Sequence, residues 1–268
     1  KTVLFDDDSK LQFIGTYAFN ESSIERVKIP STVHTIESFA FYECMNLINV
    51  DFKDDSELEI INKFLFACSP IKTMFIPSKV RSIESYAFSS CDNLENITFS
   101  KNSRLQKICD SSFFKAKLER ISIPSSVTKI DYAFYEAEHL KTVEISKDSK
   151  LQIIGKYSFC CSKIDSIFIP AHVRIIKSNA FEHCENLKKV VFADNSELKY
   201  IGSHAFDNTA IETITIPSNV SKIKHNSFSH CKNLITVDFS QSTKLTTIPE
   251  ELFDSSSIEF INIPPHIT

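Results

Sequence analysis

The sequence has only three glycines, and they lie far apart at Gly15, Gly155 and Gly202. A loop that cradles a phosphate needs clustered glycines, so this spacing excludes that kind of nucleotide site. No stretch approaches the roughly 18 apolar residues that a membrane-spanning helix needs. The first residues form no apolar signal region. We therefore expect no membrane insertion within this segment.

An excess of positive charge is also missing, since the formal net charge is −4. Nucleic-acid binding normally requires a basic face, so we expect no nucleic-acid partner. The sequence has no Cys-x-x-Cys pair, and His183-Cys184 and His230-Cys231 are two repeats apart, so we predict no metal site. The histidines show no recognisable spacing with a Ser or Cys nucleophile. We predict no catalytic residues, no cofactor and no enzymatic activity.

Phenylalanine, in contrast, recurs at an alternating step of 22 and 25 residues, with one step of 21. The residues that keep this rhythm are Phe19, Phe41, Phe66, Phe88, Phe113, Phe134, Phe159, Phe181, Phe206, Phe228 and Phe253. Repeat lengths in the twenties are typical of a solenoid, in which each repeat contacts only its neighbours. We predict one solenoid domain over residues 1–268. Because Lys1 begins in mid-repeat without an initiator Met, we expect the chain to be a fragment of a longer one.

Short alternating segments predict the strands of this solenoid. Six lie in the longer repeats, at 3–5, 50–52, 97–99, 143–145, 190–192 and 237–239, and six in the shorter ones, at 27–29, 74–76, 121–123, 167–169, 214–216 and 261–263. Apolar residues alternate with others in each segment, as in a half-buried strand. A proline follows each strand of the second set, at a place where no N–H is needed. The long crossovers favour a parallel sheet of about twelve strands.

Ala-Phe pairs mark a second recurring segment, for example Ala87-Phe88 and Ala180-Phe181. We interpret these segments as single helical turns, which makes the fold α/β, and we expect their rings to stack as a buried spine. The three glycines and Asn62 share one position after Leu-x-x-Ile. Gly and Asn both tolerate positive φ, so we predict a left-handed turn there.

The repeat resembles the BspA-like subclass of leucine-rich repeats. That subclass reads L-x-x-I-x-I-P-x-x-V-x-x-I-x-x-x-A-F-x-x-C-x-x-L, and residues 76–94 read IPSKVRSIESYAFSSCDNL. The resemblance extends from Val3 to Ile267, with departures such as Leu65-Phe66 and Ser112-Phe113 in place of Ala-Phe. It implies a right-handed horseshoe whose parallel sheet forms the concave face, with loops or short helical turns on the convex side.

The resemblance also implies a non-enzymatic protein-binding module at the cell surface or in secreted form. Its partner would be a protein, such as a host or extracellular matrix protein, and the open ends of a solenoid allow self-association. The alternative is an intracellular scaffold or regulatory subunit on the same solenoid. A cytoplasmic location therefore stays open at this point.

Strand alternation assigns the outward positions of the sheet. Most are small or polar, as a solvated face requires, but Phe75 and Phe168 are aromatic, and Val191 lies one strand from Phe168. Exposed apolar residues ringed by polar ones are typical of binding hot spots, although isolated ones are also normal on any surface. The predicted ligand-binding residues are Phe168, Val191, Lys189, Ser166, Glu144, Phe75, Asp51, Arg26 and Lys28.

Most of the eight cysteines fall in one column when the repeats are aligned on the apolar residue that leads each strand. The runs Cys44/Cys68/Cys91 and Cys161/Cys184 then lie on neighbouring turns. Neighbouring turns are about 5 Å apart, which is inside the Cα range for a disulfide. One bridge in each run is an open alternative to a ladder of small, reduced, half-buried thiols.

Overall fold

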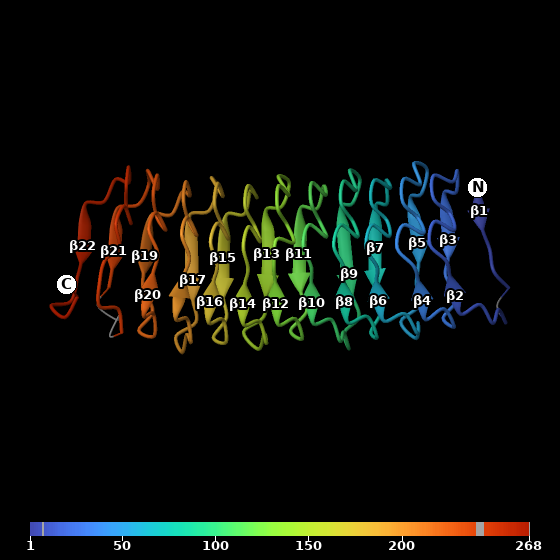
Figure 1. Ribbon diagram of the computed structural model, residues 1–268, viewed down its shortest axis with the longest axis horizontal. Helices are drawn as coiled ribbons and strands as arrows, with labels where there is room; N and C mark the ends of the chain where they lie inside the picture. The colour runs from blue at the N-terminus through green and yellow to red at the C-terminus, as the bar shows by residue number, and fades with distance from the viewer. Residues whose placement is uncertain (7, 240–243, 268) are drawn as a thin grey trace.

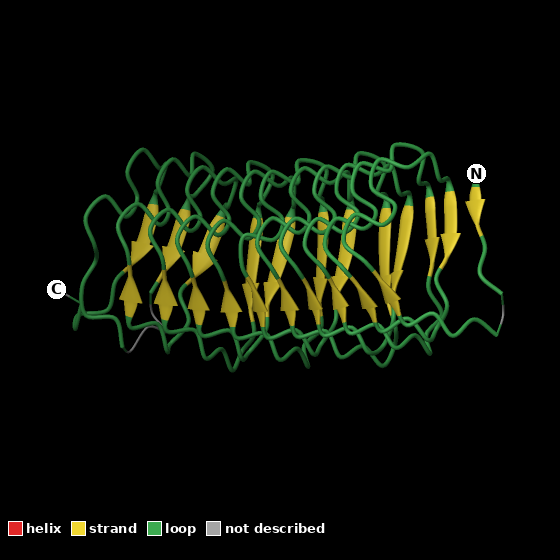
Figure 2. Cartoon of the chain, turned by 45° about the vertical axis from the view of Figure 1, so that its right-hand side comes forward, coloured by secondary structure: helices red, strands yellow, loops and turns green. Residues whose placement is uncertain are grey.

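The computed structural model describes residues 1–6, 8–239 and 244–267 and shows an elongated parallel-strand solenoid of about 11 turns. The turns lie side by side along the long axis, with the two termini at opposite ends (Figure 1). Within the described residues every regular element is a strand. Two rows of strands run along the solenoid, connected by loops (Figure 2).

The first row, which we call the front sheet, confirms the predicted strands. Its members are β1 (Thr2–Val3), β3 (Arg26–Lys28), β5 (Asn49–Asp51), β7 (Thr73–Ile76), β9 (Asn96–Phe99), β11 (Arg120–Ile123), β13 (Thr142–Ile145), β15 (Ser166–Ile169), β17 (Lys189–Phe192), β19 (Thr213–Thr215), β21 (Thr236–Asp238) and β22 (Phe260–Asn262). Hydrogen bonds divide the row into four sections, β1-β3-β5-β7-β9, β11-β13, β15-β17 and β19-β21-β22. Pairing within each section is parallel, for example Phe75 opposite Thr98.

The second row was not predicted. Its members are the two-residue strands β2 (Phe13–Ile14), β4 (Thr35–Ile36), β6 (Ile60–Ile61), β8 (Ser82–Ile83), β10 (Lys107–Ile108), β12 (Lys129–Ile130), β14 (Ile153–Ile154), β16 (Ile175–Ile176), β18 (Tyr200–Ile201) and β20 (Lys222–Ile223). Each ends in a buried isoleucine. Alternation cannot be recognised in a two-residue element, so the sequence shows the buried residue but not the strand.

The predicted helical turns do not form, so the α component of the α/β prediction is wrong for the described residues. In the segment around Phe19, the amide of Ala18 donates to the carbonyl of Gly15 over 3.2 Å, and the amide of Asn20 donates to the carbonyl of Tyr17 over 3.1 Å. These two hydrogen bonds close local turns. The amide of Phe19 instead donates to Ala40 on the next turn, at 2.8 Å. A helix would bond these amides within the segment. Here alternate amides are directed to the neighbouring turn instead.

This alternation requires left-handed backbone at two residues per turn. Tyr17 and Glu21 have φ of 59° and 53°, and every turn repeats this pair four residues apart. Such conformations cost about 1–3 kcal/mol at a residue other than glycine. The hydrogen bonds to the next turn offset that cost, so the segment is stable only within the stack.

The glycines do not occupy these left-handed positions, and the prediction of positive φ for them is wrong, because none has positive φ. A Cβ on Gly202 would collide with the backbone at Lys177 and Ser178 in the preceding turn, and a Cβ on Gly155 would collide with Asp131. Both glycines are therefore needed for close approach of two turns. Gly15 has more room, since its nearest neighbour would be 3.5 Å away.

The predicted phenylalanine spine is confirmed, and we call it the phenylalanine column. Rings on successive turns stack with centroids 5.0 Å apart for Phe19 and Phe41 and 6.0 Å apart for Phe228 and Phe253, the shortest and longest of the column. From Phe41 to Phe228 the side chains are fully buried. Their spacing is close to the roughly 4.8 Å between neighbouring strands. The rings in the core therefore repeat at about the same spacing as the strands.

Candidate functional site

The predicted ligand-binding residues all lie on the front sheet, but in separate groups. Phe168 and Ser166 on β15 face Val191 and Lys189 on β17, respectively. Val191 is exposed and Phe168 is half-buried. The Ser166 hydroxyl donates to the carboxylate of Asp165 over 2.9 Å. These four predicted residues therefore form one surface.

The other predicted residues lie further along the sheet. Lys28 on β3 is opposite Asp51 on β5, and Arg26 is opposite Asn49. The Asn49 amide donates to the Asp51 carboxylate over 2.8 Å.

The last two predicted residues lie beside these two groups. Glu144 on β13 is exposed and pairs with Ser122 on β11, and β13 also contacts β15, the strand of Phe168. Phe75 on β7 is half-buried and packs against the core, one residue after Met74, which pairs with Val50, so it lies beside Asp51. The structure therefore does not bring all nine predicted residues into one site.

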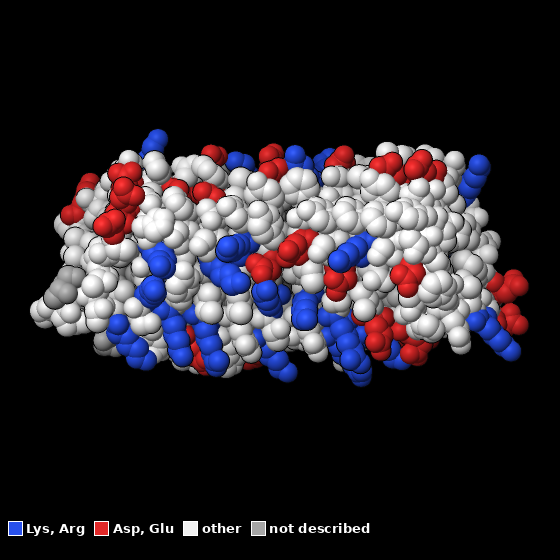
Figure 3. Space-filling model, viewed as in Figure 1, with Lys and Arg blue, Asp and Glu red and all other residues white. Residues whose placement is uncertain are grey.

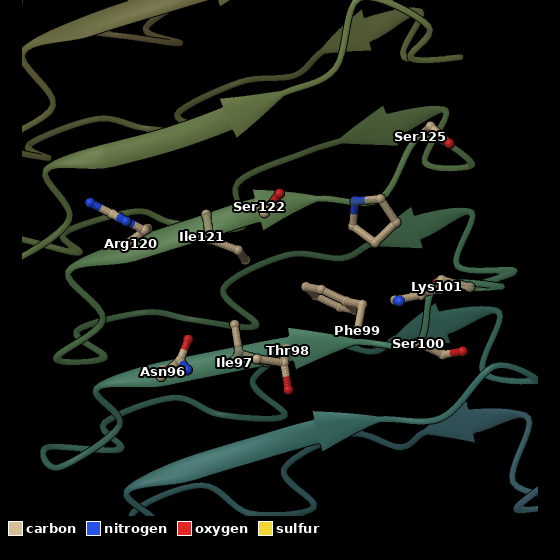
Figure 4. A pocket seen from close by; sticks show the side chains of 12 residues that line it. Asn96, Ile97, Thr98, Phe99, Ser100, Lys101, Arg120, Ile121, Ser122 and Ser125 are labelled. Carbon is tan, nitrogen blue, oxygen red and sulfur yellow. The ribbon is translucent and has the colours of Figure 1, made fainter. Parts of the chain in front are cut away.

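Two open grooves coincide with breaks between hydrogen-bonded sections of the front sheet. The first lies between β9 and β11 and has a volume of about 380 Å³. We call it the Thr98 groove, and Figure 4 shows Asn96 and Thr98 on one strand with Arg120 and Ser122 on the other. Its lining combines polar side chains with the apolar residues Ile97, Phe99, Ile121 and Pro124.

The second groove, the Val191 groove, lies between β17 and β19 and has a volume of about 450 Å³. Lys189 and Val191 line one side, and Thr213 and Thr215 line the other. Val191 occupies the register position that Thr98 has in the first groove, since Phe168 pairs with Val191 as Phe75 pairs with Thr98. Sequence reasoning located Val191 but missed the groove, because no sequence pattern marks a break in the hydrogen-bond ladder.

Charged side chains of both signs are present on the face that Figure 3 shows. In the view of Figure 3, Lys and Arg gather along the lower edge toward the C-terminal end, while Asp and Glu gather near both ends. Several charges on neighbouring turns pair, such as Lys163 with Glu185 at 3.1 Å and Arg174 with Glu197 at 2.9 Å. No helix in the described part of the chain has the length and hydropathy needed to cross a membrane.

The repeat geometry is matched by a known family. The family model described as BspA type leucine-rich repeat region, with six copies, matches residues 12–141, 101–197 and 152–268. The chain belongs to the BspA type leucine-rich repeat family. Leucine-rich repeat proteins are generally non-enzymatic binding modules and typical scaffolds for protein interaction, and no catalytic family matches.

The chain is also similar to solved structures, and the first described here shares its fold. A leucine-rich repeat protein from Eubacterium ventriosum is 23% identical, with a TM-score of 0.56, over 96% of this chain and 65% of that one. A leucine-rich repeat protein from Bacteroides ovatus is 22% identical, with a TM-score of 0.48, over 94% and 88% of the two chains. No curated protein matches the sequence.

The cysteines of this BspA type chain do not form the predicted single column. The structural column contains the third residue after each column phenylalanine: Ser22, Cys44, Ser69, Cys91, Ala116, Ala137, Ser162, Cys184, Thr209, Cys231 and Ser256. Cysteine therefore alternates with a hydroxyl or alanine, except that Ala137 stands where the alternation would place a cysteine. The Cys184 sulfur lies 3.4 Å from the Ser162 hydroxyl. Cys68 and Cys161 lie one residue earlier, at left-handed positions. The alignment behind bridges within Cys44/Cys68/Cys91 and Cys161/Cys184 is thus wrong, and all eight cysteines are free.

Burial keeps these thiols protonated. It raises the pKa of Cys184 to about 12 and that of Cys109 to about 11. The Cys184 thiol donates to the carbonyl of Phe159 over 3.0 Å. Since the thiolate is the reactive form, the buried cysteines are poor nucleophiles at neutral pH and act as core residues.

A group of potential metal ligands lies outside the front sheet, in the segments between β16 and β17 and between β18 and β19. Glu182, His204 and Asp207 each present one donor atom within 4.8 Å of the other two. The prediction of no metal site rested on spacing within the sequence. Glu182 and Asp207 are 25 residues apart and meet only because they occupy neighbouring turns.

Proposed function

We propose that this chain is a protein-binding module that acts at the cell surface or in secreted form and binds its partner at the Val191 groove. The observation that carries the proposal is the exposed Val191, which lines the groove together with Lys189, Thr213 and Thr215 and pairs with Phe168 on the neighbouring strand. Membership of the BspA type family supports a binding role and a surface location.

The groove has the composition of an interface hot spot. An apolar centre supplies the energy of desolvation, and a polar rim excludes water and fixes orientation. Here Val191 in the groove and Phe168 beside it form the apolar centre, and Lys189 and Ser166 lie two residues earlier on the same strands, at the rim. A short apolar side chain of a partner protein, flanked by an acidic residue that reaches Lys189, is complementary to this arrangement.

The charged residues of β3 and β5 offer a second contact for a large partner. β5 and β17 are separated by six strand spacings, which is about 29 Å at 4.8 Å per strand. Lys28, Arg26 and Asp51 would then contribute orientation and association rate rather than most of the affinity. Glu144, on β13, lies between the two regions.

Site-specific photocrosslinking tests the location of the site. A photoreactive amino acid replaces Val191 in one variant and Thr98 in another, and each is exposed to extracellular proteins from the source cells and their surroundings. We expect a discrete crosslinked protein at position 191 and none at position 98. Equal crosslinking at both positions, or none at 191, contradicts the proposal.

Affinity measurements on the crosslinked protein then test the side chains. Biolayer interferometry should show that Phe168→Ala with Val191→Ser weakens binding by about 30-fold or more, the effect of a hot spot worth 2 kcal/mol. The matched control is Phe75→Ala with Thr98→Ser, which makes the same kind of change at the equivalent register of β7 and β9. Protease treatment of intact cells, with detection of the released repeat domain, tests the surface location separately.

A further inference from the structure

Three successive turns bring ionisable side chains together on the side of the solenoid formed by the turn segments. Glu182 lies between β16 and β17, His204 and Asp207 lie between β18 and β19, and His230 follows β20. Backbone hydrogen bonds fix their register, because the amide of His183 donates to the carbonyl of Asp207 over 2.9 Å. Glu182 and Asp207 are equivalent residues of neighbouring turns, each directly after a column phenylalanine.

Asp207 is the centre of the group. Its side chain is only 10% exposed. One carboxylate oxygen lies 2.9 Å from Nδ1 of His204, and the other lies 3.0 Å from Nδ1 of His230. Glu182 is held by Asn179, whose amide donates to its carboxylate over 2.9 Å. Each acid is therefore oriented by a neighbouring side chain before any ligand binds.

Two carboxylates lie close together in this group. The donor atoms of Glu182 and Asp207 are within 4.8 Å of each other on neighbouring turns, and Asp207 is almost buried, so the two carboxylates repel each other. A bound cation removes this repulsion.

We propose that Glu182, His204 and Asp207 bind a divalent transition-metal ion of the zinc class. One imidazole and two carboxylates form a mixed nitrogen and oxygen donor set, which suits zinc and its neighbours better than magnesium or calcium. Three protein ligands leave a coordination position open to solvent or to a partner's side chain. The His204 side chain is 35% exposed, so the ion has a path to the site.

Small side-chain rotations close the site. The donor atoms lie within 4.8 Å of one another, and ligands on a tetrahedral zinc ion are about 3.3 Å apart, given metal–ligand distances of about 2.0–2.2 Å. The ion takes the place of the hydrogen between His204 Nδ1 and an Asp207 oxygen. His230 then stays hydrogen-bonded to the other Asp207 oxygen and orients the carboxylate, as second partners of metal ligands do.

Metal binding would connect neighbouring turns of the solenoid. Glu182 comes from one turn, whereas His204 and Asp207 come from the next. An ion that binds the folded stack and not the separated turns stabilises the stack by RT ln(1 + L/Kd), where L is the concentration of free ion. The expected consequence is a zinc-dependent rise in the melting temperature.

Titration of the chelator-treated, reduced chain with zinc chloride tests the proposal. Isothermal calorimetry should show one ion per chain, with a Kd of 10 µM or below. Asp207→Asn should weaken binding at least tenfold. His204→Asn provides a second variant, and Asn suits the site because His204 has a φ of 55°. Circular dichroism without metal checks that each variant is folded.

Two matched variants serve as controls. Asp254→Asn removes a carboxylate from the same position two turns later, and His225→Gln removes an imidazole whose ring packs edge-on against His204, with centroids 5.7 Å apart. Both should bind zinc as the wild type does. Cobalt binding should give visible bands without a thiolate charge-transfer band, which separates this site from binding by the cysteines. Absence of binding, thiolate ligation, or equal affinity in Asp207→Asn and Asp254→Asn would overturn the proposal.

Discussion

The phenylalanine column and the outward face of the front sheet pass through the same turns, yet they differ in composition and exposure. The column has the same side chain in each of the eleven turns, and its inner members are fully buried. The outward positions change from strand to strand, as in Lys28, Asp51, Phe75 and Val191. Stacking requires that each turn present the same shape to the next, whereas a solvent-facing position has no such constraint.

Within one repeat, different residues therefore determine the stability of the fold and the binding of a partner. A residue in a repeated, buried column contacts its equivalents on both sides, so its replacement affects three turns. A residue on the open face contacts few neighbours, so its replacement affects mainly what binds there. Changes in the two regions should therefore affect different measurements.

The largest expected effect follows from Phe134→Ala. This substitution removes a fully buried ring that stacks on Phe113 and Phe159, at 5.1 and 5.3 Å. We expect a loss of about 3–5 kcal/mol in the free energy of unfolding, measured by urea denaturation. Binding at the Val191 groove should be unchanged while the variant is folded. A loss below about 1 kcal/mol would contradict the role of the column.

Gly202→Ala is expected to have the second largest effect. A Cβ at this residue meets the backbone of Lys177 and Ser178, which cannot move without displacing the preceding turn. Overpacking of this kind costs about 1–3 kcal/mol. Gly15→Ala is the matched control, because its Cβ would have an ordinary contact 3.5 Å from Phe13. Equal unfolding midpoints for the two variants would show that the turns are not constrained by this approach.

A smaller effect is expected from the pH dependence of the buried thiols. Burial raises the pKa of Cys184 from its ordinary value of 9.0 to about 12. Because the folded-state pKa is raised, the contribution of this thiol to stability is complete below pH 9 and is lost as pH rises toward 12. The loss is about 1 kcal/mol between pH 8 and pH 10.

Cys184→Ala isolates this contribution. Alanine occupies the same column at Ala137, so the substitution is compatible with the turn. Urea unfolding at pH 8 and pH 10 should show a smaller decrease in stability for Cys184→Ala than for the wild type. The same decrease in both proteins would mean that ionisation of this buried thiol does not contribute.

The strands, the parallel pairing and the phenylalanine column could be predicted because each depends on a side chain that recurs every turn. The second sheet and the paired left-handed turns could not, since they depend on the direction of individual amides. Residues as different as Phe39, Glu43, Cys68 and Asn179 adopt positive φ. Their common feature is a backbone amide that donates to the next turn, which leaves no mark on residue type.

The candidate site was predictable only in part, for the same reason. Val191, Lys189, Ser166 and Phe168 were found because alternation identifies outward positions of neighbouring strands. The grooves lie at two of the three places where hydrogen bonding between described strands of the front sheet is interrupted, β9/β11 and β17/β19. Glu182 and Asp207 are neighbours because of the register between successive turns of the solenoid. The predicted cysteine column was misaligned by one residue at Cys68 and Cys161, which shows that a shift of one residue changes which side chains are neighbours.

The smallest expected change in stability comes from converting one groove into the other. Asn96→Lys with Thr98→Val gives the Thr98 groove the outward side chains that Lys189 and Val191 give the Val191 groove. Both positions face solvent on a strand, so the free energy of unfolding should change by no more than about 0.5 kcal/mol.

In the Phe168→Ala, Val191→Ser background, the two substitutions should restore part of the affinity for the partner, measured by biolayer interferometry. Phe75 already occupies the position beside residue 98 that Phe168 occupies beside Val191. Failure to restore any affinity would show that recognition depends on Thr213 and Thr215 or on more distant residues, and not on the apolar centre and its lysine.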